Sequence, residues 1–376
     1  MFKNIALIAL LMSNSVFASY DPILPYAHEL KKGFSKLMQG YQEKRGGWGD
    51  IDQQWWQQSR ALDLLIRYMD RTKDFQYWPK VVNSFNNLQV TSPGYRNNYN
   101  DDMLWWAMLW TETHRFILGN QAGLKKSHPK IDLEALLKQT LNIGVTLYEM
   151  QIEQWGDNDY QAGLTWEDDG SQINAIENIL FPLVGYLLFL ETKKDFYLSF
   201  ADEALSFFID EFIDDKSNLI IDGPINVKNI EMKHWSYTHG IFIQAIINRQ
   251  IISELYPHLT PVDFDIDAFT ENAISRFSER GVMAEFYKNL DQNQQLFKGI
   301  FTLALHNYSS HKLGFSIESF LKRQVKQIKS ITHDLNDLIP ATWNGEGNKP
   351  GNFITQISGL SPFLALIMLD DPEDHR

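Results

Sequence analysis

Apolar residues recur at the spacing of α-helices through almost the whole chain of 376 residues, whereas the alternation typical of β-strands is rare. The helical segments are separated by polar or glycine-containing turns such as Gly119-Asn120, Gly223-Pro224 and Pro350-Gly351. About twelve segments follow this pattern, at residues 22–43, 50–71, 75–90, 101–119, 131–153, 171–192, 195–214, 235–256, 266–286, 292–309, 314–335 and 353–369. Each needs a partner for its apolar face, so the chain must fold as an assembly of packed helices.

The helical segments show no division into separate domains. No proline- or serine-rich linker and no shift in composition interrupts them, so residues 19–376 are predicted to form a single domain. Six helical hairpins closed into a ring, an all-α (α/α)6 barrel, would bury about twelve such helices as one unit. An open solenoid of helix pairs is the alternative, although no repeat of fixed length is present.

The first 18 residues have the features of a secretory signal peptide. Lys3 supplies a positive charge, residues 5–12 are apolar, and Val16-Phe17-Ala18 precedes a cleavage position before Ser19. The chain contains no cysteine, so it has no site for a lipid attached through that residue. No later stretch consists of roughly 18 uninterrupted apolar residues. We therefore expect an exported protein, periplasmic or secreted, without an integral membrane segment after the signal is removed.

Composition restricts the partners. The formal net charge is −13, and removal of Lys3 with the signal makes it −14, so nucleic acids and anionic membrane surfaces are poor candidates. The chain contains 11 tryptophans, and aromatic residues make up 13% of it. This composition favours a neutral polymer as the ligand. The absence of cysteine also excludes disulfides and thiolate chemistry.

Two adjacent carboxylates, Asp101 and Asp102, stand beside Trp105, Trp106 and Trp110 at the start of an apolar helix. They could simply be N-terminal helix residues, because the partial positive charge at the start of a helix stabilises acidic side chains. Paired carboxylates flanked by aromatic rings are also what cleavage of a glycosidic bond requires, because one group acts on the leaving oxygen and the other on the anomeric carbon. Adjacency places the carboxyl groups at roughly the 5–5.5 Å that direct attack needs, which predicts a retaining reaction.

The block Tyr99-Asn100-Asp101-Asp102-Met103-Leu104-Trp105-Trp106 resembles the signature of glycoside hydrolase family 76, the endo-α-1,6-mannanases. The similarity continues in chain order from about residue 30 to about residue 310, through Gly163-Leu164-Thr165-Trp166, Asn174-Ala175-Ile176-Glu177-Asn178, Asp222-Gly223, Tyr237-Thr238-His239-Gly240 and Phe297-Lys298-Gly299-Ile300. The chain departs from the family pattern at Thr165, Ile173 and His239, which affects the expected sugar subsites.

The resemblance implies an (α/α)6 fold and hydrolysis of α-mannan backbones, with Asp101 as nucleophile and Asp102 as general acid/base. The substrate would be a mannose-containing polysaccharide or oligosaccharide, and no cofactor or metal is expected. Predicted substrate-binding residues are Tyr99, Asn100, Trp105, Trp166, Asn174, Tyr237, His239 and Lys298. We expect a monomer.

Several of these residues have a structural alternative. Trp166 could anchor its loop, Asn174 could cap a helix, His239 could be a structural histidine, and Lys298 could extend to solvent. Trp106 and Trp110, four residues apart on one helix face, are predicted to lie in the core, whereas Trp105 is predicted to face the cleft. Trp48, Trp55 and Trp56 could form a further part of the rim or pack in the core.

Other functions remain open. A transglycosylase would carry the same two aspartates and differ in its acceptor subsites, and a non-catalytic glycan-binding barrel would not need both. A sugar epimerase or uronyl hydrolase would need paired histidines or basic residues that we do not find. Asp157-Asn158-Asp159 resembles the start of a calcium loop, but Ala162 occupies the position where that loop requires glycine.

Overall fold

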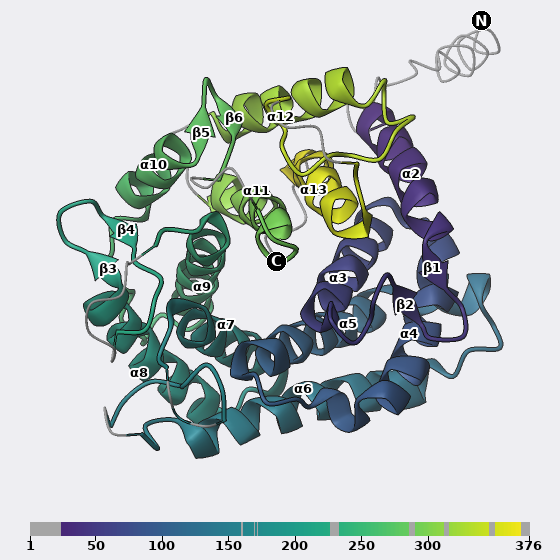
Figure 1. Ribbon diagram of the computed structural model, residues 1–376. Helices are drawn as coiled ribbons and strands as arrows, with labels where there is room; N and C mark the ends of the chain where they lie inside the picture. The colour runs from purple at the N-terminus through teal and green to yellow at the C-terminus, as the bar shows by residue number, and fades with distance from the viewer. Residues whose placement is uncertain are drawn as a thin grey trace, which may run out of the picture.

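The computed structural model describes residues 24–158, 161–168, 170, 172–225, 233–285, 290–311, 316–345 and 350–369. Within these residues, twelve α-helices form an inner and an outer ring (Figure 1). The inner ring contains α3 (Trp55–Thr72), α5 (Asn100–Ser127), α7 (Ala175–Thr192), α9 (Ser236–Leu255), α11 (Gln294–His311) and α13 (Phe353–Leu369). The outer ring contains α2 (Leu24–Gln39), α4 (Trp78–Thr91), α6 (Leu133–Gln154), α8 (Asp195–Phe212), α10 (Ile266–Arg276) and α12 (Ile317–Ile331). Each inner helix contacts the next, and α13 contacts α3, so the ring is closed and the predicted (α/α)6 barrel is confirmed.

The two rings differ in how their apolar residues are distributed. An outer helix such as α12 buries Phe320, Leu321 and Val325 on one face and exposes Lys322 and Lys326 on the other. The inner helices α7 and α13 are buried along most of their length, because they have neighbours on every side. A helix enclosed in this way is apolar around its whole circumference.

Helix α7 is, among the described residues, the one helix long and apolar enough to cross a membrane by length and composition. In the fold, 83% of that stretch is buried inside the protein. Its position in the inner ring therefore explains its apolar character. The absence of a membrane-spanning segment stays a prediction from the sequence.

Helix α5 is longer than the sequence pattern indicated. The predicted end at Gly119-Asn120 is wrong, because the helix continues to Ser127. Gly123 lies in this extension, and a Cβ atom there would come within 2.4 Å of Cε2 of Phe75. This glycine therefore permits close packing and does not end the helix.

In the described part of the chain, three two-stranded antiparallel hairpins lead from an outer helix to the next inner helix. They are β1 (Tyr41–Gln42) with β2 (Gly47–Trp48), β3 (Ile213–Asp214) with β4 (Leu219–Ile220), and β5 (Ser278–Glu279) with β6 (Val282–Met283). The last hairpin explains why α10 ends at Arg276, ten residues before the predicted end. Short 3-10 helices cover Phe75–Tyr77 and Pro93–Tyr95. Strands of two residues give no detectable periodicity in a sequence.

The N-terminal ends of the inner helices meet at one end of the barrel, which we call the mouth. Side-chain hydrogen bonds connect these ends around the ring. Trp56 of α3 donates to Asn293 just before α11 (3.1 Å), and Asn352 just before α13 donates to Gln295 (2.9 Å). The backbone N–H of Ala175 at the start of α7 donates to Asp222, which precedes α9 (3.2 Å). The mouth is thus the place where residues far apart in sequence come together.

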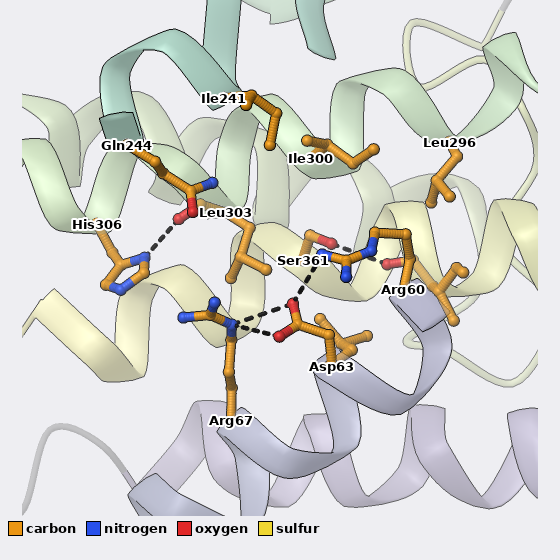
Figure 2. A pocket seen from close by; sticks show the side chains of 12 residues that line it. Arg60, Asp63, Arg67, Ile241, Gln244, Leu296, Ile300, Leu303, His306 and Ser361 are labelled. Atoms are coloured by element: carbon orange, nitrogen blue, oxygen red, sulfur yellow. Dashed lines mark hydrogen bonds and ion pairs between the residues drawn. The ribbon is translucent and has the colours of Figure 1, made fainter. Parts of the chain in front are cut away.

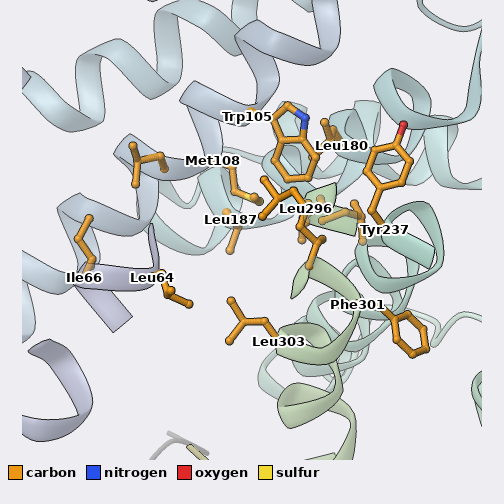
Figure 3. Packing of buried hydrophobic residues seen from close by; sticks show 14 of the residues in the cluster. Leu64, Ile66, Trp105, Met108, Leu180, Leu187, Tyr237, Leu296, Phe301 and Leu303 are labelled. Atoms are coloured by element: carbon orange, nitrogen blue, oxygen red, sulfur yellow. The ribbon is translucent and has the colours of Figure 1, made fainter. Parts of the chain in front are cut away.

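Most side chains in the barrel interior below the mouth are hydrophobic. Figure 3 shows some that the inner helices contribute, including Leu64, Met108, Leu187 and Leu303. Trp106 and Trp110 are buried in the core, as the sequence predicted; they pack against Tyr95 and stack on each other, with ring centroids 5.9 Å apart. Trp48 and Trp55 are buried as well. Most of the tryptophans that suggested a sugar-binding surface therefore stabilise the barrel.

Candidate active site

Asp101 and Asp102 lie half-buried in the first turn of α5, at the mouth. The backbone of Tyr99 is extended, so the helix begins at Asn100. This start is fixed to the loop before α7, because the backbone N–H of Asn100 donates to the carbonyl of Trp166 (2.9 Å) and its side-chain amide donates to that of Thr165 (2.8 Å). Asn100 is 0% exposed. The prediction that it contacts sugar is therefore corrected, and it instead orients the acid pair.

The protein raises the pKa of both catalytic candidates. Burial raises the pKa of Asp101 well above its usual value, the neighbouring Asp102 raises it further, and hydrogen bonds from the first-turn backbone and the Trp166 side chain oppose the change. Burial also raises the pKa of Asp102 to about 7, although the amide of Asn97 donates to its Oδ2 (2.6 Å) and favours the charged form. Because each charge disfavours the other, the two carboxyls titrate as a pair.

The two carboxyls of this pair differ in their surroundings. Asp102 has the Asn97 amide as a donor, whereas Oδ1 of Asp101 is buried and has no hydrogen-bond partner among the described residues. The pKa of Asp101 is raised well above its usual value in spite of the hydrogen bonds from Trp166 and the first-turn backbone, whereas that of Asp102 is raised to about 7, so the proton favours Asp101. A nucleophile at position 101 and an acid at position 102 need the opposite distribution, so a further donor to Asp101 would favour its charged form.

Two more carboxyls complete the cluster. Glu177, in the first turn of α7, is 0% exposed, and its pKa is raised by burial and by the charges of Asp101 and Asp222. Burial raises the pKa of Asp222 to about 6, against hydrogen bonds from the backbone N–H of Ala175 and from the Tyr237 hydroxyl. We refer to Asp101, Asp102, Glu177 and Asp222 as the mouth cluster.

Tyr237 lies at the start of α9, against the mouth cluster. Its ring stacks on Phe297 with centroids 3.8 Å apart and an interplanar angle of 4°. The charges of Asp222, Asp101 and Glu177 add to burial in raising the pKa of its hydroxyl well above the usual value. The structure thus brings this predicted site residue to the acid pair, with its hydroxyl held by Asp222.

Tyr99 and Trp166 form an aromatic surface beside the acid pair. Their ring centroids are 5.2 Å apart, Tyr99 is 37% exposed, and Trp166 is half-buried. Backbone pairing of Tyr99 with Glu167 holds the two residues together. The sequence proposed both residues for sugar contact, and both remain accessible next to Asp101.

On another part of the mouth, Trp56 is the accessible ring, whereas the sequence predicted that Trp105 would face the cleft. Trp105 is 1% exposed and stacks on Trp56, with ring centroids 5.5 Å apart. The guanidinium of Arg60 lies 4.6 Å from the centre of the Trp105 ring. Trp105 is therefore a buried support, and the half-buried Trp56 carries the accessible aromatic face.

His239 and Asn174 have structural roles. Nε2 of His239 accepts from the backbone N–H of Ile220 (3.0 Å), and Nδ1 donates to the carbonyl of Trp235 (2.8 Å). Burial lowers the pKa of this ring to about 3, so it is neutral and has no nitrogen left for a sugar. Asn174 forms a capping box with Glu177 at the start of α7. The substrate-binding prediction is therefore corrected for His239, and Asn174 follows its structural alternative.

Lys298 points inward and does not extend to solvent. It is 1% exposed, and its Nζ lies 5.5 Å from the centre of the Trp343 ring, without a hydrogen-bond partner among the described residues. Burial lowers its pKa to about 8, and Glu285 opposes that change. Glu285 in turn accepts hydrogen bonds from the backbone N–H (3.3 Å) and the hydroxyl of Ser236 at the start of α9. Contact between Lys298 and a sugar stays a prediction.

Below the mouth lies a small cavity of about 20 Å³, shown in Figure 2. Side chains of α3, α9, α11 and α13 line it, and they combine apolar residues with charged and polar ones, among them Arg60, Asp63, Arg67, Gln244 and His306. The volume suffices for about one water molecule. A sugar ring cannot enter it, so this cavity is no part of a substrate subsite.

Four residues that interact with predicted site residues escaped the sequence analysis or were left undecided there: Asn97, Glu177, Glu285 and Trp56. Asn97 stands five residues before its partner Asp102, outside the helix, where periodicity carries no information. Glu177 entered the sequence analysis only as a member of the Asn174–Asn178 block. A buried acid in a helix as apolar as α7 was the available signal.

No group of three or more histidine or acidic side chains in the described parts of the chain could hold a metal ion. In the segment that resembles the start of a calcium loop, the Asn158 amide donates to the carbonyls of Ala162 (3.2 Å) and Gly163 (3.1 Å). Asp159 lies outside the described residues.

Solved structures share this architecture. An inactive variant of an α-1,6-mannanase from Salegentibacter sp. HEL1_6, with two consecutive aspartates changed to asparagine and α-1,6-mannotriose bound, superposes with a TM-score of 0.71 at 17% identity, over 92% of this chain and 100% of that chain. A family 76 glycoside hydrolase (mannosidase) from Bacteroides thetaiotaomicron gives 0.71 at 15% identity, over 92% and 98%. Dfg5 from Chaetomium thermophilum, in complex with glucosamine, gives 0.68 at 14% identity, over 91% and 90%. At these identities the likeness establishes the fold.

The sequence itself carries the family assignment. No functionally curated protein sequence matches the chain. The model of glycosyl hydrolase family 76 matches residues 25–374, which include the mouth cluster and nearly all of the barrel. The chain therefore belongs to glycosyl hydrolase family 76.

Proposed function

We propose that this protein is an exported, retaining endo-α-1,6-mannanase. Membership of family 76 makes it a glycosidase. The observation that carries the finer proposal is the pair Asp101 and Asp102 at the mouth, with raised pKa values and accessible aromatic rings beside it. The mannotriose and mannotetraose bound to the structurally similar Salegentibacter enzyme support α-1,6-linked mannose as the substrate.

In the first step of this mechanism, the carboxylate of Asp101 attacks C1 of the mannose unit while protonated Asp102 gives its proton to the departing glycosidic oxygen. The C1–O bond to the leaving sugar breaks, and an ester bond from C1 to Asp101 forms. In the second step Asp102 takes a proton from water, whose oxygen attacks C1 and releases Asp101. Two inversions at C1 retain the α-configuration.

The accessible aromatic residues would hold the polymer on either side of the scissile bond. Trp166 and Tyr99 lie beside Asp101, and Trp56 lies on α3, the neighbouring inner helix. Flat rings suit the apolar faces of neutral sugars, and the net charge of −13 is no obstacle to an uncharged chain. Several such rings around the acid pair would contact more than one sugar unit, which suits internal cleavage of a long chain.

The test is incubation with linear α-1,6-mannan, followed over time by product sizing and by proton NMR of fresh products. Internal cleavage predicts a spread of oligosaccharides whose new reducing ends appear first as α-anomers. Initial β-anomers would contradict the paired mechanism and point to a wider pair that includes Asp222. Products longer than the input would identify a transglycosylase. Binding of mannan without any products would indicate a glycan-binding barrel.

A further inference from the structure

Glu177 is a buried acid whose two oxygens have different surroundings. Its Oε1 accepts hydrogen bonds from the backbone N–H of Asn174 and from the Asn178 amide (3.4 Å). Its Oε2 is buried and has no hydrogen-bond partner among the described residues. The contacts of this one carboxyl are therefore concentrated on a single oxygen.

That asymmetry indicates the charge state. An ionised carboxylate is acceptor-only on both oxygens, and a bare charged oxygen in a buried site is costly. A neutral carboxylic acid has one carbonyl oxygen that accepts and one hydroxyl that donates. Two donors on Oε1 and none on Oε2 are the pattern expected when Oε2 carries the proton. Burial raises the pKa of Glu177 in the same direction.

The charged groups around Glu177 also disfavour its ionised form. The charges of Asp101, on the neighbouring inner helix α5, and of Asp222, in the segment before α9, both raise its pKa. Tyr237 of α9 interacts with the same carboxyls. Among the described residues, Lys233 is a cation that acts on Asp222 and lowers its pKa. Three neighbouring carboxyls cannot all be charged in so buried a place.

Across the cluster, Oδ1 of Asp101 is the second buried carboxyl oxygen without a partner among the described residues. The charge of Asp101 is, after burial, the largest influence on the pKa of Glu177. One oxygen therefore lacks a donor, and a neighbouring group has a proton without an acceptor. A hydrogen bond from Glu177 to Asp101 would therefore satisfy both groups.

We propose that Glu177 remains protonated during turnover and that its O–H donates a hydrogen bond to Asp101, which keeps Asp101 ionised and oriented for attack. Glu177 acts through Asp101, so it is a positioning residue. The proposal rests on the proposed function, in which Asp101 is the nucleophile. The Glu177 O–H would favour the charged form of Asp101, as the Asn97 amide favours the charged form of Asp102.

The kinetic test compares Glu177→Gln with Glu177→Met. Glutamine keeps a neutral donor and an acceptor, so kcat/KM on α-1,6-mannan should remain close to that of the wild type. Methionine removes the donor, and the loss of one hydrogen bond to a charged group should lower kcat by about ten- to hundredfold with KM little changed. The acidic limb of the pH profile should move to higher pH in Glu177→Met alone, because Asp101 becomes harder to ionise. Equal profiles in both variants would overturn the proposal.

An infrared test works without catalysis and therefore separates this proposal from the proposed function. At pH 7.5, the difference spectrum of wild type minus Glu177→Gln should contain the C=O band of a protonated carboxyl. That band should shift in an Asp101→Asn background, because the acceptor of the O–H has lost its charge. A missing band, or one insensitive to Asp101→Asn, would overturn the proposal even if the wild type proved inactive on mannan. Melting curves of each variant show whether it is folded.

Discussion

Buried ionisable groups occur at two levels of this barrel, and their environments differ. Within the barrel, Asp63 of α3 accepts from Arg67 (3.0 Å) and lies 3.5 Å from Arg60, while Arg67 also approaches Glu112 (3.8 Å). His306 stays neutral there, because burial and the Arg67 charge lower its pKa to about 4. Opposite charges thus compensate each other around the small cavity of Figure 2.

At the mouth, by contrast, like charges are neighbours. Asp101, Asp102, Glu177 and Asp222 all have raised pKa values, and two of their oxygens lack donors in the described part of the protein. Compensated charges hold helices together, whereas uncompensated ones are costly to the fold. The difference suggests that the inner pairs serve stability and the mouth cluster serves chemistry.

If the mouth cluster exists for chemistry, its removal should affect turnover and leave the fold intact. Asp101→Asn and Asp102→Asn should each lower kcat on α-1,6-mannan by at least about 10³-fold, because each removes the nucleophile or the proton donor. Circular dichroism should show unchanged helix content. Near-normal turnover in either variant would contradict a catalytic role for the mouth cluster.

If the inner charges exist for stability, the converse should hold for Asp63→Asn. Removal of the shared carboxylate leaves Arg60 and Arg67 without their buried partner, which should lower the free energy of unfolding by about 3–5 kcal/mol. The matched control is Asp52→Asn, whose exposed pair with Arg45 should contribute at most about 1 kcal/mol. Denaturant titration measures both. An equal, small loss in the two variants would show that the inner pairs do not stabilise the barrel.

The free-energy cost of placing like charges together at the mouth can be measured from the pH dependence of protein stability. The folded pKa of Asp102, about 7, lies above its unfolded value, so its contribution to stability is complete below the unfolded pKa and is lost as pH rises through 7. Asp102→Asn should therefore be more stable than the wild type by about 4 kcal/mol above pH 7, and the gain should vanish near pH 4. A gain in stability that does not depend on pH would show that removal of the Asp102 charge is not its cause.

The smallest expected effect tests the division of roles within the pair. Asn97→Ala removes a donor that favours ionised Asp102, so the pKa of Asp102 should rise. If Asp102 is the acid, the alkaline limb of the pH–rate profile moves to higher pH. Movement of the acidic limb instead would identify Asp102 as the nucleophile and reverse the assignment of roles.

The fold and the acid pair could be predicted because their signals are local. The helical period predicted the barrel, and the adjacency of Asp101 and Asp102 located the catalytic candidates. The environment of the pair could not be predicted in the same way. The Asn100 amide contacts a residue 65 positions away, and the choice between Trp56 and Trp105 as the accessible ring depends on packing between two helices.

His239 is another residue whose role could not be predicted from local sequence patterns. A histidine at the start of an apolar helix fits a sugar-binding role as well as a structural one. The answer depends on the backbone N–H of Ile220 in strand β4, which no pattern around residue 239 reveals. Tertiary hydrogen bonds therefore decided the roles that composition and spacing left open.

The common direction of the inner helices has an electrostatic consequence. Six helices present their N-terminal ends to the mouth, and each end carries a partial charge of about +0.5. Such a field favours ionised acids but opposes the positive charge that develops on a sugar ring during cleavage of its glycosidic bond. The carboxyls of the mouth cluster supply the negative charge that offsets the helix ends. The barrel can therefore place a cation-like transition state at the positive pole of its own helices.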